Sequence, residues 1–196
     1  MYDLEEAIRE RRSIRMFLPE RPVARDVVEE ACQLAIRAPS SSNIQPWHVV
    51  FASGPARDRL VAALLKEAQA KPPNIPPVPA AFAQPRRDMG ARLYGAGMGI
   101  ARDDKAARHI AVFRNWEFFR APLAGIVCIH REIGPADCVG VGMFLQTLVL
   151  ALTARGLGTC AQVSISGYPE VVREQLVSRK RSGRGTNSPT EYIFFE

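Results

Sequence analysis

Arginine and hydroxyl side chains gather near the start of the chain. Residues 11–15 read Arg-Arg-Ser-Ile-Arg, which places three guanidinium groups and one hydroxyl within five residues. A planar guanidinium can donate two parallel hydrogen bonds to one oxyanion, so the stretch predicts a site for a phosphate group. Arginines at the C-terminal end of a helix also interact favourably with the helix dipole. Taken alone, the stretch favours that simpler interpretation.

A second polar segment precedes a stretch of apolar residues. Residues 38–47 read Ala-Pro-Ser-Ser-Ser-Asn-Ile-Gln-Pro-Trp, and the apolar run 47–52 follows them. Small hydroxyls and carboxamides in such a loop can donate hydrogen bonds to a flat heteroaromatic ligand and accept them from it. The same composition is also typical of an ordinary connection between a helix and a strand.

Together, the two segments resemble the FMN-dependent nitroreductase family. The family pattern is Arg-Arg/His-Ser-x-Arg/Lys, followed further along by Ala-Pro-Ser-Ser-x-Asn-x-Gln-Pro-Trp, and residues 11–15 and 38–47 match both parts. Gly-Met-Phe-Leu-Gln at 142–146 and Gly-Leu-Gly-Thr-Cys at 156–160 look like the buried helix of the family and the strand after it. The resemblance extends from residue 1 to about residue 176.

The resemblance implies three groups of cofactor-binding residues. The phosphate and ribityl chain of FMN would be held by Arg11, Arg12, Ser13 and Arg15. The isoalloxazine ring would be approached from the other subunit by Pro39, Ser40, Ser41 and Asn43. The N5 edge of the flavin, where a backbone N–H donates, would lie near Gln162, Val163 and Ser164. No catalytic side chain is implied, because the flavin itself accepts and delivers the hydride.

The resemblance also implies a fold and an activity. The fold would be α+β, with a central, mainly antiparallel sheet surrounded by helices, in an intertwined homodimer. NADH or NADPH would reduce FMN, and a nitroaromatic, a quinone or a similar flat acceptor would then bind the same face, in ping-pong order. Enoate reduction, dehalogenation and a relative that binds FMN poorly remain alternatives. A non-enzymatic nucleic-acid-binding protein is the alternative of another class, because the net charge is +6.

Apolar periodicity and breaker residues divide the chain into elements. Asp3 and Glu6 form a capping-box pattern for a first helix, and six prolines between residues 71 and 85 exclude regular structure there. Helices are also expected at 25–37, 55–70, within 86–119, at 136–154 and at 168–177. Strands are expected at 47–52, 123–130 and 159–164.

Length and composition predict one domain. Residues 1–177 of the 196 would form it, and 178–196 would be a divergent, disordered or loosely docked tail that resembles no family segment, where the family continues with a further strand and an extension. Four cysteines without a CxxC pair predict no disulfide framework and no metal site. The charged N-terminus and the short apolar run 139–154 predict a cytoplasmic protein that engages no membrane, and no nucleic-acid partner is expected of the reductase.

Overall fold

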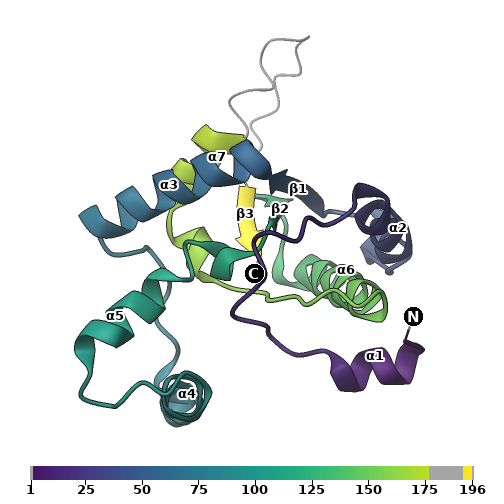
Figure 1. Ribbon diagram of the computed structural model, residues 1–196. Coiled ribbons are helices and arrows are strands. Elements are labelled where there is room, and N and C mark those ends of the chain that lie inside the picture. The colour runs from purple at the N-terminus through teal and green to yellow at the C-terminus, as the bar shows by residue number, and fades with distance from the viewer. Residues whose placement is uncertain (1, 177–191, 196) are drawn as a thin grey trace.

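A small antiparallel sheet lies at the centre of the molecule, with helices around it (Figure 1). The computed structural model describes residues 2–176 and 192–195. The strand order is β1-β2-β3, and the strands are β1 (His48–Ser53), β2 (Leu123–His130) and β3 (Tyr192–Phe195). The expected α+β architecture with a mainly antiparallel sheet is therefore confirmed.

The register of β1 and β2 assigns their side chains to two faces. The pairing runs from His48 opposite Cys128 to Ser53 opposite Leu123. Because side chains alternate along a strand, Ala124, Ile126 and Cys128 share one face. That face packs in a core cluster with helices α3 (Gly54–Ala70) and α7 (Pro169–Leu176). The opposite face carries Val127 and Ile129 toward helix α6 (Pro135–Ala154).

Helix ends follow the sequence signals closely. The capping box at Asp3 and Glu6 begins helix α1 (Leu4–Glu10). Helix α2 (Arg25–Ala35) stops two residues before the predicted end. Gly156 has φ +78° after the last turn of α6, and the N–H groups of Gly156 and Leu157 donate to Thr153 and Leu152, as in a Schellman motif.

Residues 71–120 form an excursion from the sheet, and Figure 1 shows its helices α4 and α5 well away from α2. No helix or strand occupies residues 71–79, as predicted, but helical structure begins earlier than expected, at residue 80. Pro85 is tolerated in the first turn of α4 because an N–H there has no intrahelical partner. The helical elements are η2 (Ala80–Phe82), α4 (Ala83–Ala91), the π-helical η3 (Arg92–Gly97), α5 (Lys105–Phe113) and η4 (Phe118–Arg120).

The prediction of a strand at 159–164 was wrong. Residues 159–164 do not form a strand: Thr159 makes one isolated bridge, and the 3-10 turn η5 (Ser164–Gly167) begins at the end of this range. A strand needs a neighbouring ladder, and among the described residues only Ser13 pairs here. Conversely, β3 lies inside the predicted divergent tail and pairs with Val127–His130 of β2. The remaining tail residues fall outside the described part, so the domain boundary at 177 stays a prediction.

Helix α6 is the apolar helix expected at 136–154. Among residues 2–176 and 192–195 it alone is long and apolar enough to cross a membrane, with 20 residues and a mean hydropathy of 1.6 in its most apolar window. Only 33% of that window is buried within one chain. The buried positions Val141, Phe144 and Leu148 face the sheet and α2, as in a core helix. Val139 and Met143 are exposed.

Candidate functional site

The arginine-rich segment 11–15 lies against the segment that follows α6. The backbone N–H of Ile14 donates to the carbonyl of Thr159 at 2.9 Å. Ser13 and Thr159 form an isolated parallel bridge, and the Ser13 hydroxyl and the Arg15 charge both act on the thiol of Cys160. Two of the three groups of residues predicted to bind cofactor therefore belong to adjoining stretches, 11–15 and 159–164.

The guanidinium groups of the cluster leave positive charge uncompensated. Within residues 2–176, no carboxylate lies within 4.0 Å of Arg11 or Arg15. Arg12 has one acidic neighbour, Glu10, at 3.6 Å, and both side chains are well exposed. An exposed pair of this kind contributes little, so the cluster keeps the charge needed to bind an anion. The position of Arg11 just after the last turn of α1 also satisfies the simpler helix-end interpretation.

The pKa of the Cys160 thiol is affected by residues of the arginine-rich segment. Burial raises its pKa, whereas the positive charge of Arg15 and a hydrogen bond with Ser13 lower it. Burial has the larger effect, so the pKa stays above its ordinary value and the thiol is protonated at neutral pH. The residue is half-buried and marks the place where the two segments meet.

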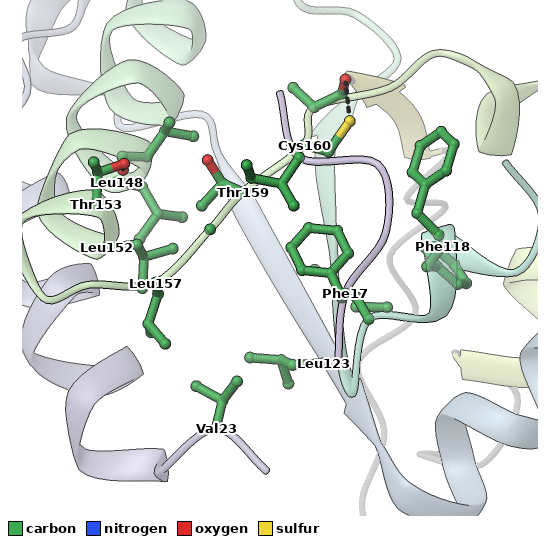
Figure 2. Close-up of a pocket in the computed structure, with 18 of the residues that line it drawn as sticks. Phe17, Val23, Phe118, Leu123, Leu148, Leu152, Thr153, Leu157, Thr159 and Cys160 are labelled. Carbon is green, nitrogen blue, oxygen red and sulfur yellow. Dashed lines mark hydrogen bonds between the residues drawn. The ribbon is translucent and has the colours of Figure 1, made fainter. Parts of the chain in front are cut away.

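A large cavity lies behind the two segments. Its volume is about 690 Å³, and its wall is mostly apolar. Figure 2 shows Leu148 and Leu152 of α6 on one side, Leu157, Thr159 and Cys160 of the following segment beside them, and Phe17, Phe118 and Leu123 across the space. Arg11 and Arg12 line it as well, so the cavity adjoins the cluster.

Residues 162–164 are held by hydrogen bonds with residues 115 and 116, near the end of the excursion. The Gln162 amide donates to the carbonyl of Asn115 at 3.2 Å, and the Trp116 indole N–H donates to the carbonyl of Ser164 at 3.3 Å. The amide oxygen of Gln162 is buried without a partner among the described residues. No described group accepts a hydrogen bond from the N–H of Gln162 or Val163. These polar atoms remain available to a ligand.

The polar loop at 39–45 is tightly wound and sits on α6. Ser42, Asn43 and Gln45 have φ between +46° and +57°, and the Ser40 hydroxyl accepts from the Gln45 N–H at 3.0 Å. A Cβ on Gly140 would lie 3.3 Å from the carbonyl oxygen of Pro39, so a side chain at this position would require the loop to shift by a few tenths of an ångström. Pro39, Ser41 and Asn43 are exposed.

The loop does not meet the arginine cluster within one chain. It contacts the first part of α6, at Gly140. The arginine cluster instead pairs with the segment that follows the end of α6 at Ala154. These two points on α6 are about 21 Å apart along the helix axis, at 1.5 Å per residue. No hydrogen bond or ion pair joins residues 39–43 to 11–15 in the described chain.

Sequence reasoning missed the residues that anchor the site. The carbonyl of Asn115 and the indole of Trp116 hold residues 162–164 across almost fifty positions of sequence. Thr159 had been placed in a strand, and Cys160 had no assigned partner. No local pattern marks such long-range contacts. Among the described residues no group of three or more His, Cys, Asp or Glu could hold a metal ion.

The chain matches the nitroreductase family over residues 8–177. Nitrobenzene nitroreductase of Ectopseudomonas oleovorans is 36% identical over 180 residues, which cover 88% of this chain and 79% of that protein. Nitroreductase NfnB of Mycolicibacterium smegmatis is 35% identical over 179 residues, covering 88% of this chain and 75% of the relative.

Solved structures show the same relationship. The FMN-dependent nitroreductase NfnB of Mycobacterium smegmatis, solved in complex with NADPH, has a TM-score of 0.84 and 31% identity and covers 97% of this chain, which covers 83% of it. The FMN- and NADPH-dependent NfnB of Sphigopyxis sp. strain HMH has a TM-score of 0.85 and 30% identity, with 99% and 85% covered.

Proposed function

Because this chain belongs to the nitroreductase family, we propose that it is an FMN-dependent oxidoreductase that uses NADH or NADPH to reduce nitroaromatics, quinones or similar flat acceptors. The observation that carries the proposal is the uncompensated arginine cluster beside the segment 159–164. Relatives named as nitroreductases, and structural neighbours described as dependent on FMN and NADPH, support the choice of cofactor.

The cluster fits the phosphate of FMN. Arg11 and Arg15 have no acidic partner among the described residues, and Ser13 adds a hydroxyl beside them. Charge-assisted hydrogen bonds from guanidinium to phosphate are about twice as strong as neutral ones. We assign Arg11, Arg12, Ser13 and Arg15 to the phosphate and the ribityl chain. Arg11 and Arg15 contribute most, because the charge of Arg12 is partly countered by Glu10.

The segment 162–164 fits the polar edge of the ring. No acceptor among residues 2–176 and 192–195 bonds the N–H groups of Gln162 and Val163, so they can donate to the ring, and the buried amide oxygen of Gln162 can accept. Asn115 and Trp116 fix this segment, so its donors are oriented before a ligand arrives. The bound flavin would supply the two-electron chemistry, and this chain would supply position, donors and positive charge.

The loop at 39–43 completes the site from a second copy of the chain. Within one chain it lies apart from the cluster, yet its exposed Ser41 and Asn43 present polar groups to solvent. The surface around it is apolar: Leu34, Ile36, Ile44, Val139 and Met143 are all exposed on α2, α6 and the loop. Burying this surface in a homodimer supplies a favourable free energy of association. We therefore propose an FMN site shared between two protomers.

Cofactor content tests the cluster directly. The purified chain is expected to bind FMN near one per protomer, with flavin absorbance bands, and to oxidise NADH or NADPH in the presence of nitrobenzene or a quinone. Replacing both Arg11 and Arg15 by alanine should weaken FMN binding by about tenfold to a hundredfold. Arg59→Ala, an exposed arginine on α3, is the control and should bind normally. Equal loss in both variants, or no FMN binding by the parent chain, would contradict the proposal.

Mixed dimers test whether the site is shared. Protomers with Arg15→Ala and protomers with Asn43→Ala each lack one half of every site in their own dimers. Random mixing restores one intact site in each mixed dimer, which is about a quarter of all sites. A site built within one chain would gain nothing on mixing. The same preparation, assayed with quinone, enoate and halogenated acceptors, identifies the acceptor class. The cytoplasmic location stays a prediction.

A further inference from the structure

The excursion carries most of the surplus positive charge of the chain. Residues 83–114 contain seven basic and three acidic residues, which accounts for four of the net charge of +6. Arg114 is paired with Glu117 at 2.6 Å. Within residues 2–176, by contrast, no carboxylate lies within 4.0 Å of Arg102 or Arg108. Their positive charge is therefore available to an anion that this chain does not itself provide.

The side chain of Arg108 is oriented by an aromatic ring. Its guanidinium carbon lies 5.3 Å from the centre of the Tyr94 ring, on the π-helical η3, a form that often occurs at functional sites. The Nε of Arg108 is buried without a hydrogen-bond partner among the described residues. A guanidinium stacked on a ring keeps its N–H edges free, and these can donate two parallel hydrogen bonds to a phosphate. Arg108 is thus positioned for an anion before one arrives.

The turn after η3 brings a second arginine to the same region. The N–H of Ile100 donates to the carbonyl of Tyr94 at 2.8 Å, and Arg102 follows two residues later. The acidic neighbour Asp104 uses its carboxylate to cap the first turn of α5. Arg102 and Arg108 therefore lie on either side of the junction between η3 and α5, close to one aromatic ring.

A small apolar pocket opens beside these arginines. Its volume is about 270 Å³, and its wall is formed by one side of α5, by Met98 and Ile100 from the turn after η3, and by Met16. A dry apolar cavity of about 150 Å³ already holds a benzene ring, so this pocket has room for a planar base of two rings. The thioether groups of the two methionines also make favourable contacts with aromatic rings. The pocket therefore fits a purine.

The pocket adjoins the candidate cofactor site. Met16 lines both this pocket and the larger cavity. Just beyond the end of α5, the carbonyl of Asn115 accepts the hydrogen bond from Gln162. Arg108 lies only about 8 Å before the end of α5, at 1.5 Å per residue. A dinucleotide with its nicotinamide near Gln162 can therefore extend its adenosine end along α5.

We propose that the pocket and the two arginines bind the adenosine 2′-phosphate end of NADPH, so that the chain selects NADPH over NADH. The inference rests on the proposed function as an FMN-dependent oxidoreductase. The apolar pocket takes the adenine base, and Arg102 and Arg108 donate to the 2′-phosphate. NADH carries a neutral hydroxyl at that position, which cannot form the stronger charge-assisted hydrogen bonds with the two guanidinium groups.

Calorimetric binding of nucleotide fragments tests the proposal without turnover. The purified chain should bind adenosine 2′,5′-bisphosphate about tenfold or more tightly than 5′-AMP. Replacing both Arg102 and Arg108 by alanine should abolish this difference, whereas Arg59→Ala, on the exposed face of α3, should preserve it. If the double variant does not fold, Arg102→Ala alone should reduce the difference, because Arg102 is exposed. Equal affinities in the parent chain, or tighter binding of adenosine 3′,5′-bisphosphate, would overturn the proposal.

A filled pocket tests where the base binds. Ala107→Trp places a large ring in the pocket wall and should weaken binding of both fragments about tenfold or more. Ala106→Trp, one residue earlier and exposed, should not. Unchanged binding with the pocket filled would place the adenosine elsewhere and overturn the proposal.

Steady-state kinetics separate this inference from the proposed function. In the variant that lacks Arg102 and Arg108, the ratio of kcat/KM for NADPH to that for NADH should fall about tenfold or more. A parent chain that oxidises NADH as efficiently as NADPH would keep the proposed function and overturn the inference. A chain that binds adenosine 2′,5′-bisphosphate through the two arginines but oxidises neither dinucleotide would support the binding site and contradict the proposed function.

Discussion

The two sides of the small sheet are packed very differently. Toward α3 and α7, Leu60 and Leu64 are fully buried, Val172 is 1% exposed, and aromatic residues close the cluster. Toward the segments 11–23 and 156–162, the sheet edge opens onto the cavity of about 690 Å³. The candidate cofactor residues Arg11, Arg12 and Gln162 line the open side, whereas the loop at 39–43 packs on α6. The packed side therefore supplies the stability that positions them, and the open side supplies space and unpaired polar groups.

The open side is held by a few backbone hydrogen bonds instead of a core. Ile14 bonds to Thr159, and the N–H of Phe17 donates to Phe119 at 3.1 Å. Regions with few buried apolar contacts open at lower free energy than the global unfolding of the protein. We therefore expect substitutions on the two sides to differ in size even when the chemical change is identical.

Leucine truncation should show the largest contrast. Leu64→Ala on α3 removes a fully buried side chain and should lower the free energy of unfolding by about 2–5 kcal/mol. Leu152→Ala on α6 makes the same change beside the existing cavity and should cost less than half as much, because part of the side chain already faces empty space. Urea unfolding of both variants measures the two values. Equal costs would mean that the cavity is closed in solution.

The end of α6 should show the next largest effect. Gly156 has φ +78°, and a Cβ there would meet open space, so Gly156→Ala carries only the conformational cost of the left-handed region, about 1–2 kcal/mol. Gly142→Ala, in the middle of the same helix and also with open space around it, should stabilise the chain by about 0.5–1 kcal/mol. Two changes of the same sign would show that the turn after α6 is not fixed as described.

Filling the cavity should have a smaller and opposite effect. Leu152→Phe adds apolar volume on the open side and should raise the free energy of unfolding by about 1 kcal/mol or less. The matched change on the packed side, Leu64→Phe, should lower it by about 1–3 kcal/mol, because no space is available there. Denaturant midpoints of the two variants test the sign. Stabilisation of both would remove the distinction between the two sides.

The sequence predicted the packed side better than the open one. The helix at 55–70 and the strands at 47–52 and 123–130 were found within one or two residues, because apolar periodicity and continuous apolar runs report local burial directly. The segment 159–164 has an equally strand-like composition but lacks a ladder, whereas β3 is a run of only four apolar residues, Tyr-Ile-Phe-Phe, inside the segment predicted to be a tail. Pairing between distant segments has no signature in either one.

The candidate site residues also divide into those that have a local sequence signal and those that depend on contacts between distant segments. The arginines at 11–15 and the loop at 39–43 were predicted as site residues from their types and order, through the family resemblance, and this assignment stays a prediction. The meeting of Ser13 and Arg15 with Cys160, and the support of 162–164 by Asn115 and Trp116, depend on how the excursion folds back. That geometry comes from tertiary packing, so residue types alone could not predict it.

Cys128 on the packed side and Cys160 on the open side should differ in their reactivity toward iodoacetamide. Burial on the packed side raises the pKa of Cys128 to about 12, so its thiolate is scarce at pH 8. Cys160, on the open side, is half-buried, and Arg15 and Ser13 partly offset the rise of its pKa. Iodoacetamide at pH 8, followed by mass spectrometry, should therefore label Cys160 well before Cys128, because the thiolate is the reacting form.

The rate of cysteine labelling should also rise with pH. Below the pKa of each thiol, the thiolate fraction rises about tenfold per pH unit, so labelling of Cys160 should rise in that proportion between pH 7 and pH 8. Arg15→Ala removes the charge that lowers the pKa of Cys160 and should slow its labelling, while Arg37→Ala should leave it unchanged. Faster labelling of Cys128 than of Cys160 in the folded chain would show that the side of the sheet facing α3 and α7 is the one that opens.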